Sequence, residues 1–558
     1  MMSASERERS TRAEFDFDWI VVGSGFGGAV SALRLAEKGY SVAVLECGRR
    51  FEDEDFAKST VWQPRRYFWW PRLGMRGILR MSFFKDVFVV SGSGVGGGSL
   101  GYANTLYRAR PAFFRDPQWA DLGDWEAELS PHYETAERML GVVEYEGIGP
   151  ADQLLKEYGE EIGVEETFTS TRVGVYFGES GETVDDPYFG GEGPTRTGCH
   201  RCGSCMVGCR HGAKNTLVKN YLWFAEKLGV TVIPERNVTG IRPLGAADGS
   251  DGYAVTSERT GAWLRKQPQT ATARGVVVAA GALGTNHLLA NCRHAGTLPR
   301  LSPRLGELVR TNSESIQAVT ALDDARDFSR SVAITSSIYP DPDTHIEVVT
   351  YGEAGDMMSR TFTAMTGPGT KLTRPLKWIA AMLRHPLRTL RMLIPFRWSR
   401  RTVILLVMQT VDAAMRLRPK RKIFGRGVRL QTEQDPERPN PIHLPAAEAA
   451  ARWFEQRMGG IAQSALTESI QNVPTTAHIL GGVVVGEGPD TGVVDTGNRV
   501  FGYESLLVCD GAAVPANPGV NPSLTITAKA EHAMSLIPPK DDEGPRHLPE
   551  AARPAIPS

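Results

Sequence analysis

The sequence predicts an α/β fold with a parallel sheet near its N-terminus. Apolar runs at 16–23 and 41–46 flank an amphipathic segment, which is the pattern of a strand, a helix and a second strand. Residues 275–290 read as a buried strand, a turn through Gly281 and Gly284, and the start of a helix, so we expect a further parallel strand of the same sheet. A chain of 558 residues is too long for one hydrophobic core, which predicts one large two-part unit or two interleaved domains.

The composition excludes several classes of protein. With 63 basic and 64 acidic residues the net charge is −1, so the chain has no overall attraction for nucleic acid. No stretch approaches the roughly 18 to 20 apolar residues of a membrane span, and the opening residues carry no apolar signal segment. Seven cysteines are too few for a disulfide scaffold. We therefore expect a cytoplasmic protein whose thiols are free or bound to metal.

A dinucleotide-binding motif lies between the first two predicted strands. Gly23, Gly25 and Gly28 have the spacing G-x-G-x-x-G, and Glu46 closes the second strand. The first glycine permits a tight turn, the second lets the backbone approach a pyrophosphate, and the third lets the helix pack closely on the strand. An acid at the position of Glu46 accepts hydrogen bonds from a ribose diol, which favours FAD or NAD over NADP. The alternative is a glycine-rich turn in an ordinary α/β fold.

Two further regions have features of a ligand site. The cluster SGSGVGGGSLGYANTLY at 91–107 lacks helical periodicity and predicts a loop that lies against a large flat ligand. Near the C-terminus, His478 and Asn521 stand on short loops beside glycines or proline, and such positions suit chemistry better than core packing. Since a single histidine is more often structural, these residues alone leave both roles open for His478.

Several motifs, taken in order, resemble those of the glucose-methanol-choline (GMC) family of FAD oxidoreductases, most closely its cytoplasmic cholesterol-oxidase-like branch. The resemblance runs from Asp16 to Leu536 and is carried by GSGFGG with Glu46, SGSGVGGGS, VVVAAGALGT, AHILGG, VCDGA and GVNPSLTITAKAE. It implies a discontinuous Rossmann-type FAD-binding domain and an α+β substrate domain with a mostly antiparallel sheet. The expected boundaries are 16–110, 215–310 and 470–537 for the FAD-binding domain, and 111–214 and 311–469 for the substrate domain.

The resemblance also implies roles for individual residues. His478 matches the active-site histidine of the family and Asn521 the asparagine of its G-x-N-P turn, so both are predicted to be catalytic. Glu314 and Glu468 are candidates for an acid or base that would isomerise a double bond. The loop 91–107 contains no histidine to tether the cofactor, which indicates noncovalent FAD. The residues predicted to bind FAD are Gly23, Gly25, Gly28, Glu46, Gly96, Gly97, Ser99, Asn104, Val238, Gly281, Asp510 and Gly511.

Four of the seven cysteines form a separate motif. Its spacing, C-x2-C-x2-C-x3-C, is that of bacterial ferredoxins, although those proteins usually continue with proline where this chain has Arg210. Zinc sites normally use two cysteine pairs separated by a longer loop. The motif leaves three alternatives open, namely an iron-sulfur cluster, a zinc ion, or unligated thiols that shape the loop. Its members are Cys199, Cys202, Cys205 and Cys209.

A basic and apolar segment covers 371–429. Many lysines and arginines are interleaved with leucine, isoleucine and tryptophan, and Asp412 is its single acid. This mixture predicts an amphipathic segment that binds anionic lipid headgroups, and the alternative is a solvated basic face over an ordinary core helix. We place this segment and the cysteine loop 199–209 in the substrate domain. Disordered tails are expected at 1–15 and 538–558.

Together these features predict FAD-dependent oxidation of a hydrophobic alcohol, with a sterol as the best single substrate. The substrate carbon would give its hydride to flavin N5, while His478 accepts or positions the hydroxyl proton and Asn521 holds the oxygen. Oxygen, a quinone or another acceptor would then reoxidise the flavin. The alternative from another class is a membrane-docked electron-transfer flavoprotein or dye-linked dehydrogenase, in which an iron-sulfur cluster passes electrons on and His478 is incidental.

Overall fold

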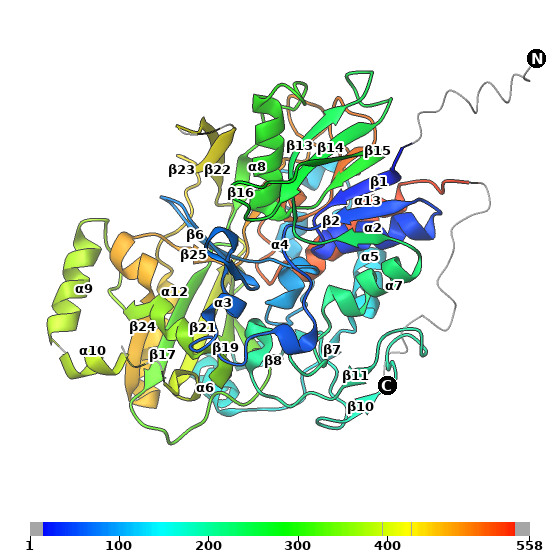
Figure 1. Cartoon of the computed structure of the whole chain (residues 1–558). Helices are drawn as coiled ribbons and strands as arrows, with labels where there is room; N and C mark the ends of the chain where they lie inside the picture. The colour runs from blue at the N-terminus through cyan, green and yellow to red at the C-terminus, as the bar shows by residue number, and fades with distance from the viewer. Residues whose placement is uncertain are drawn as a thin grey trace, which may run out of the picture.

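The protein contains two large sheets with helices packed around them (Figure 1). The structure is a computed structural model that describes residues 15–541, except 385, 393, 395, 424 and 426. The predicted tails at 1–15 and 538–558 therefore lie outside the described residues, apart from Phe15 and residues 538–541. Within the described residues, no helix is both long and apolar enough to cross a bilayer.

The first sheet has seven strands and contains the predicted parallel core. Strands β12, β2, β1, β15 and β27 run parallel, and β14 and β13 extend the sheet as an antiparallel hairpin. The predicted strands at 16–23, 41–46 and 275–290 are β1, β2 and β15. Segments from both ends of the chain thus meet in one sheet. Its strands are β1 (Phe17–Val22), β2 (Val42–Leu45), β12 (Thr231–Ile233), β13 (Arg236–Pro243), β14 (Tyr253–Arg259), β15 (Gln269–Val278) and β27 (Leu506–Val508).

Helices pack on both faces of the first sheet. On one face, α2 (Phe26–Glu37) starts directly after the glycine motif and packs against α7 (Tyr221–Lys227) and α13 (Ser523–Ser535). α5 (Trp125–Leu140) packs against α13 in the same buried cluster, although its residues fall in a segment predicted for the substrate domain. α8 (Gly281–His294) covers the opposite face. The α/β fold is confirmed, and the domain boundaries stay a prediction.

The turn predicted at Gly281 and Gly284 is placed differently in the structure. Gly281 is already the first residue of α8, and Gly284 lies inside the helix. The helix can begin this early because a side chain distant in sequence, the carboxylate of Asp510, accepts a hydrogen bond from the Gly281 amide at 2.8 Å. An acid at a helix N-terminus satisfies an amide that has no partner inside the helix.

The second sheet has seven strands, and every pair of neighbours is antiparallel, as predicted for the substrate domain. Its central strand β21 reads TVILLVMQ and is buried on both faces, because α6 (Pro150–Glu161) and α12 (Pro445–Met458) cover one face and a second apolar cluster covers the other. The strands are β8 (Thr169–Ser170), β17 (Ser315–Ala321), β18 (Ile334–Asp341), β19 (Thr344–Val349), β20 (Phe362–Ala364), β21 (Thr402–Gln409) and β24 (Gly460–Ala465).

We call the second apolar cluster the catalytic-face cluster. It includes Ile404, Leu406 and Met408 of β21, whose side chains alternate with those facing α12. Aromatic side chains from several connecting segments complete it. Its other large buried members are Phe51, Phe56, Tyr67, Ile78, Leu100, Ile334, Tyr351, Met358 and Trp398.

The predicted basic and apolar segment 371–429 is not one element. Its first part forms the helices α9 (Thr373–Arg384) and α10 (Pro386–Met392), and its second part forms strands of two sheets. The change occurs at the run TVILLVMQ, because a continuous apolar stretch suits a strand buried on both faces better than an interfacial helix. Residues 393 and 426, and the side chain of Arg388, lie outside the described part of this segment.

Smaller elements connect the two large sheets. A four-stranded sheet has the order β23, β22, β16, β26, and a three-stranded sheet has the order β25, β6, β5. These strands are β5 (Leu79–Phe83), β6 (Phe88–Gly92), β16 (Glu307–Arg310), β22 (Met415–Arg421), β23 (Val428–Gln434), β25 (Thr475–Thr476) and β26 (Leu480–Gly482). The remaining elements are α3 (Pro64–Tyr67), α4 (Pro111–Phe114), α11 (Trp398–Arg401), β3 (Trp69–Trp70), β4 (Met75–Arg76), β7 (Val143–Glu144), β9 (Arg172–Val173), β10 (Thr183–Val184) and β11 (Arg196–Thr197).

Candidate active site

A cleft of about 730 Å³ lies at the carboxyl ends of β1, β2 and β15. Parallel α/β sheets bind their ligands at this edge, outside the ends of the strands. The loop after each of the three strands contributes to the wall of the cleft. The predicted FAD-binding residues that line it are Gly23, Gly25, Glu46, Gly97, Val238 and Gly281.

The glycines of the motif behave as the spacing predicts. A Cβ atom on Gly25 would meet nothing within 4 Å, so its backbone is open to a ligand. A Cβ on Gly28 would lie 2.1 Å from the carbonyl oxygen of Gly23, which shows why helix and strand pack closely only through glycine. The two glycine loops also touch, since a Cβ on Gly97 would lie 2.6 Å from the Cα of Gly25. The two backbones thus form a cradle that side chains would fill.

Charged groups in the cleft match the parts of a dinucleotide. Glu46, at the end of β2, accepts hydrogen bonds from the amide and hydroxyl of Ser24 at 3.1 and 2.7 Å and from the Gly48 amide at 2.7 Å. Its carboxylate is therefore held at the position where a ribose diol would donate. The basic residues that could face phosphate are Arg72, Arg80, Arg236, Lys266 and Lys422. The residues present fit FAD.

The other predicted cofactor residues lie outside this cleft. Gly96 and Ser99 shape the second glycine loop, because the Ser99 hydroxyl donates to the Gly96 carbonyl at 2.7 Å and accepts from the Leu217 amide at 3.0 Å. Asn104 is fully buried with a positive φ of 68° and lines the cysteine pocket described below.

Asp510 and Gly511 connect the C-terminal strand to the cleft. Burial raises the pKa of Asp510 to about 6, and its carboxylate accepts from the Ala512 amide at 2.7 Å as well as from Gly281 and Thr285. Asp510 therefore fixes the start of α8, which borders the cleft. A Cβ on Gly511 would lie 3.1 Å from the Leu480 side chain, so this turn is tightly packed.

The predicted catalytic histidine is paired with one of the two predicted acids. The carboxylate of Glu314 contacts Nδ1 of His478, and its other oxygen accepts a hydrogen bond from the Ala477 amide at 2.7 Å. Glu314 is fully buried, whereas the His478 side chain keeps 13% of its exposure. With Nδ1 held by a carboxylate, Nε2 is the ring nitrogen that remains for a substrate.

Asn521 contacts a buried acid that the sequence analysis missed. Its amide nitrogen donates to Oε2 of Glu347, on β19, at 3.3 Å. Burial, together with the charge of Glu314, raises the pKa of Glu347 to about 8, while the hydrogen bond from Asn521 lowers it. Nδ1 of His345 lies 4.0 Å from Oε1 of Glu347, and burial lowers the pKa of this histidine to about 3. The site thus holds His478, Asn521 and two interacting acids.

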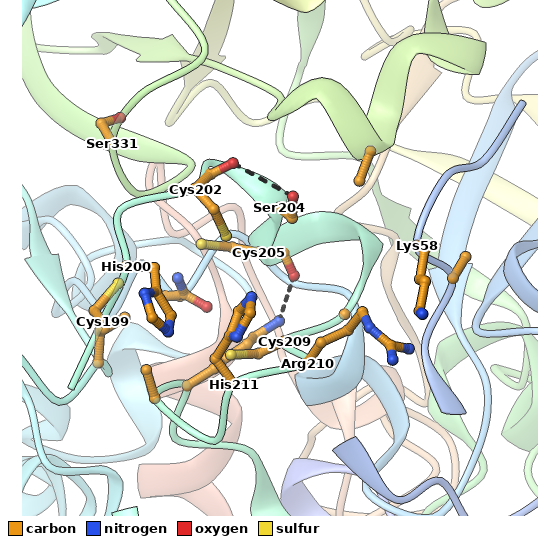
Figure 2. Close-up of a pocket in the computed structure, with 17 residues that line it drawn as sticks. Lys58, Cys199, His200, Cys202, Ser204, Cys205, Cys209, Arg210, His211 and Ser331 are labelled. Carbon is orange, nitrogen blue, oxygen red and sulfur yellow. Dashed lines mark hydrogen bonds between the residues drawn. The ribbon is translucent and has the colours of Figure 1, made fainter. Parts of the chain in front are cut away.

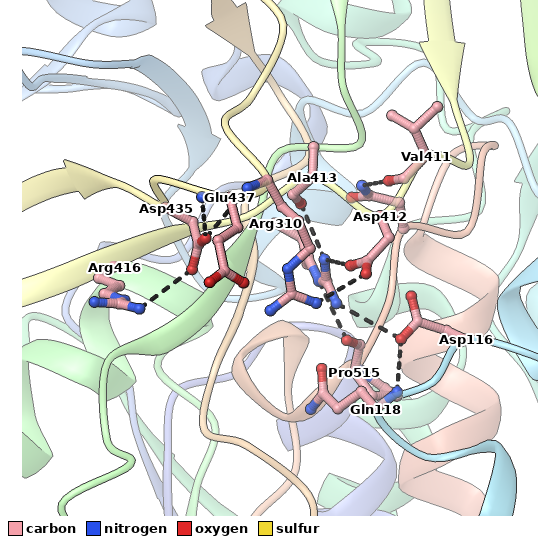
Figure 3. A network of polar contacts seen from close by, with 12 residues as sticks. Asp116, Gln118, Arg310, Val411, Asp412, Ala413, Arg416, Asp435, Glu437 and Pro515 are labelled. Carbon is pink, nitrogen blue, oxygen red and sulfur yellow. Dashed lines mark hydrogen bonds and ion pairs between the residues drawn. The ribbon is translucent and has the colours of Figure 1, made fainter.

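The turn that carries Asn521 is fixed by a network of buried polar groups. The side chain of Asn312 accepts from the Gly519 amide at 2.9 Å and donates to the Val520 carbonyl at 3.0 Å. Next to it, the fully buried guanidinium of Arg310 pairs with Asp412 and lies 3.6 Å from Asp116, as Figure 3 shows. Arg310 also donates to the carbonyl groups of Ala413 and Pro515, at 3.1 and 3.4 Å.

These features can be compared with known proteins. Models of the GMC oxidoreductase family match residues 195–296 and 406–530, and a model of an FAD-binding domain matches residues 18–66. A cholesterol oxidase of Mycobacterium tuberculosis (strain ATCC 25618 / H37Rv) is 49% identical over 540 residues, which cover 94% of this chain and 92% of that protein. The chain belongs to the GMC oxidoreductase family. This confirms the resemblance seen in the sequence and the FAD-binding domain.

A second relative and a solved structure are also similar to this GMC oxidoreductase. A cholesterol oxidase of Acinetobacter baumannii is 47% identical over 531 residues, 94% of this chain and 95% of that protein. The crystal structure of pyridoxine 4-oxidase from Mesorbium loti has a TM-score of 0.60 and 15% identity, and covers 93% of this chain and 99% of its own. At that identity the structural match shows a shared fold. The chain is thus an FAD-dependent oxidoreductase with an FAD-binding domain and a substrate domain.

The second predicted acid of this GMC oxidoreductase lies apart from His478. Glu468 accepts from Gln317 at 3.3 Å and from Ser315 at 3.5 Å, and its carboxylate lies 3.8 Å from Arg374. Ser315 and Gln317 point to the opposite face of β17 from their neighbours Glu314 and Ile316. Burial raises the pKa of Glu468 to about 7. The structure therefore brings Glu314, but not Glu468, to the histidine.

The four motif cysteines line one pocket of about 240 Å³ (Figure 2). Burial raises the pKa of Cys199 to about 11 and that of Cys205 to about 12, so both are thiols at neutral pH. The Cys205 carbonyl accepts a hydrogen bond from the buried ammonium of Lys214 at 2.9 Å. Among the described residues, no group of three or more His, Cys, Asp or Glu side chains is arranged to hold a metal ion. The predicted iron-sulfur and zinc alternatives therefore find no support here.

Proposed function

We propose that this GMC oxidoreductase oxidises the hydroxyl group of a sterol-like alcohol to a carbonyl group. The observation that carries the proposal is the pair formed by His478 and Glu314 beside the pair formed by Asn521 and Glu347. The relatives named as cholesterol oxidases support a sterol as the substrate. The residues proposed to act in the reaction are His478, Asn521 and Glu314, which the sequence analysis names as candidates, together with Glu347.

His478 is suited to take the hydroxyl proton. Glu314 engages Nδ1 and thereby selects the tautomer in which Nε2 carries a lone pair toward the substrate. When Nε2 accepts the proton, the ring becomes a cation, and the buried carboxylate of Glu314 stabilises that charge. FAD, when bound, supplies the acceptor for the hydride that leaves the carbon atom carrying the hydroxyl group. Loss of the proton and of the hydride together converts the alcohol to the carbonyl product.

Asn521 and Glu347 are suited to orient the substrate oxygen. The Asn521 amide is already oriented by its hydrogen bond to Glu347 and by the rigid turn that carries it. Since the pKa of Glu347 is about 8, this acid is mostly protonated at neutral pH and can donate a proton as well as accept one. A shift of a substrate double bond requires an acid that moves a proton between two substrate carbons. Glu347 lies beside Asn521 and is therefore better placed for that step than Glu468.

The surface beside these residues is apolar. Glu347 is paired directly with Leu406 of β21, and opposite residues of an antiparallel pair point to the same face of a sheet. Leu406 belongs to the catalytic-face cluster, so the polar site borders a large apolar region. Such a border suits an alcohol whose single hydroxyl is attached to a large hydrocarbon. The electron acceptor, the noncovalent state of FAD and the cytoplasmic location stay predictions.

An anaerobic reduction assay tests the proposal. The holoenzyme is mixed without oxygen with a panel of sterols, long-chain primary alcohols and pyridoxine, and the loss of flavin absorbance is followed. We expect sterols to bleach the flavin fastest. Bleaching by another alcohol but by no sterol would contradict the proposed substrate. A flavin that stays oxidised with every alcohol would favour the electron-transfer alternative.

A further inference from the structure

Helices α9 and α10 carry a row of solvent-exposed leucines and isoleucines. Leu376, Ile379 and Leu383 follow one another at intervals of three or four residues, which places them on one side of α9, and Leu387 and Leu390 have the same spacing in α10. The members of the row are 47 to 81% exposed, although such side chains normally face a core. We call this row the leucine stripe. It consists of Leu372, Leu376, Ile379, Leu383, Leu387, Leu390 and Ile394.

The side of α9 that faces the protein carries a buried arginine as well as half-buried apolar side chains. Arg374 is 1% exposed, and its guanidinium donates to the carbonyl oxygen of Glu468 at 2.7 Å. One turn later, the indole N–H of Trp378 donates to the hydroxyl of Thr363 at 2.8 Å. These contacts hold α9 against the protein, while its leucines and isoleucine at the other side face solvent. A helix facing only water would be stabilised by the opposite orientation.

The charges around the leucine stripe are almost all positive. Residues 371–411 contain no aspartate or glutamate. Acids from other elements pair with basic residues at the two ends of this segment: Glu468 lies 3.8 Å from Arg374, Asp327 lies 3.3 Å from Arg400, and Asp324 lies 3.6 Å from Arg401. The exposed basic residues of the two helices and their flanks are Lys371, Lys377, Arg384, Arg391 and Arg397. Positive charge beside exposed leucine matches the surface of an anionic bilayer, where headgroups and acyl chains meet.

The helical segment starts and ends at the catalytic-face cluster. It leaves the protein after β20, where Phe362 lies, and returns at Trp398, and these two rings stack with centroids 5.7 Å apart. At the return, the exposed ring of Phe396 lies 6.3 Å from that of Trp62, which is itself 75% exposed. Figure 1 shows α9 and α10 at the outer edge of the second sheet, away from the first. The exposed rings of Phe396 and Trp62 therefore add apolar surface at the end of the helical segment.

We propose that the leucine stripe docks this protein on the surface of an anionic phospholipid bilayer. The leucines and isoleucines would enter the boundary between headgroups and acyl chains, while the flanking lysines and arginines contact phosphate and carboxylate groups of the lipids. Neither helix crosses the bilayer, since both are too short for a span. Binding of the stripe to lipid does not require the proposed reaction, and the two are measured separately.

Vesicle flotation with the FAD-loaded full chain tests this surface. Vesicles of phosphatidylcholine alone are compared with vesicles that also contain phosphatidylserine, at low and high salt. We expect binding to the anionic vesicles, weakened by salt because each basic residue near such a surface contributes only while it is unscreened. Replacing three stripe residues together, Leu376→Ser, Leu383→Ser and Leu387→Ser, should weaken binding by about 100-fold, equivalent to about 2.8 kcal/mol.

Two control variants separate this stripe from apolar exposure in general. Leu264 and Ile148 are also exposed, at 95 and 59%, but they lie outside the helical segment, so Leu264→Ser and Ile148→Ser should bind anionic vesicles as the parent does. Retained FAD absorbance in each variant shows that it has folded. Equal binding to neutral and anionic vesicles, or unchanged binding of the triple variant, would overturn the proposal. A dimer in solution that the triple variant dissociates would also overturn it, because a second copy would then cover the stripe.

Discussion

Replacing Glu347 with glutamine should change how the stability of the protein depends on pH. Glu347 is completely buried on β19, and Oε1 of its carboxylate has no hydrogen-bond partner among the described residues. The folded protein therefore favours the neutral form of this acid, which raises its pKa from 4.5 to about 8. Glutamine has nearly the same shape, carries no charge and can still accept the hydrogen bond from Asn521.

The sign and size of the effect follow from the two pKa values. Below pH 4.5 Glu347 is protonated in both the folded and the unfolded chain, so it costs no stability. Between pH 4.5 and about 8 only the unfolded chain releases the proton, and stability falls as the pH rises. At 1.36 kcal/mol per pKa unit, the complete loss above pH 8 is at most about 5 kcal/mol. Glu347→Gln should remove this loss.

Urea unfolding at pH 5.5 and pH 9 measures the difference. Because part of the loss is already present at pH 5.5, the free energy of unfolding of the parent should fall between these two values by about 3 kcal/mol more than that of Glu347→Gln. Glu161→Gln, at the exposed end of α6, serves as the control and should follow the parent. If the parent and Glu347→Gln lose the same stability between the two pH values, folding does not keep Glu347 protonated.

Three further predictions concern the cofactor, the reaction and the cysteines. His478→Ala should retain FAD and reduce it about 10²- to 10⁴-fold more slowly in stopped-flow mixing with substrate; an unchanged rate would remove His478 from the reaction. Gly97→Ala should lose FAD affinity in a titration of apoprotein, because its Cβ would lie 2.6 Å from the backbone of Gly25, whereas Gly163→Ala, with open space around its Cβ, should bind FAD normally. Anaerobically purified protein should contain substoichiometric iron, and Cys205→Ser should keep the parent rate of dye-linked turnover; stoichiometric iron and sulfide with a loss of that turnover would support the iron-sulfur alternative.

Local patterns were sufficient to predict the parallel sheet and its glycine motif. The strands β1 and β2 and the helix α2 lie where the apolar periodicity places them, because each depends on neighbours within a few residues. The spacing of Gly23, Gly25 and Gly28 likewise encodes a local turn whose geometry does not depend on the rest of the chain. Such features need no knowledge of long-range contacts.

The acids of the site could not be predicted in this way. Glu347 stands in the strand THIEVVT, where the sequence offers only the weak signal of one acid among β-branched residues. Its role depends on Asn521, which lies 174 positions later and meets it only when β19 and the C-terminal turn come together. The sequence does not distinguish Glu468 from Glu314, yet in the structure Glu468 lies beside Arg374 and Glu314 contacts His478. Long-range packing therefore decides which acid faces the histidine.

The position of β27 determines when this enzyme can first become active during its synthesis. β27 pairs with β15 inside the first sheet, and His478 and Asn521 both belong to the last sixth or so of the chain. A ribosome must therefore complete nearly the whole polypeptide before the sheet closes and the catalytic groups meet. Until then the open edge of β15 is exposed to chaperones and to aggregation. A premature stop codon before β27 should therefore leave the first sheet incomplete and remove Asn521 as well.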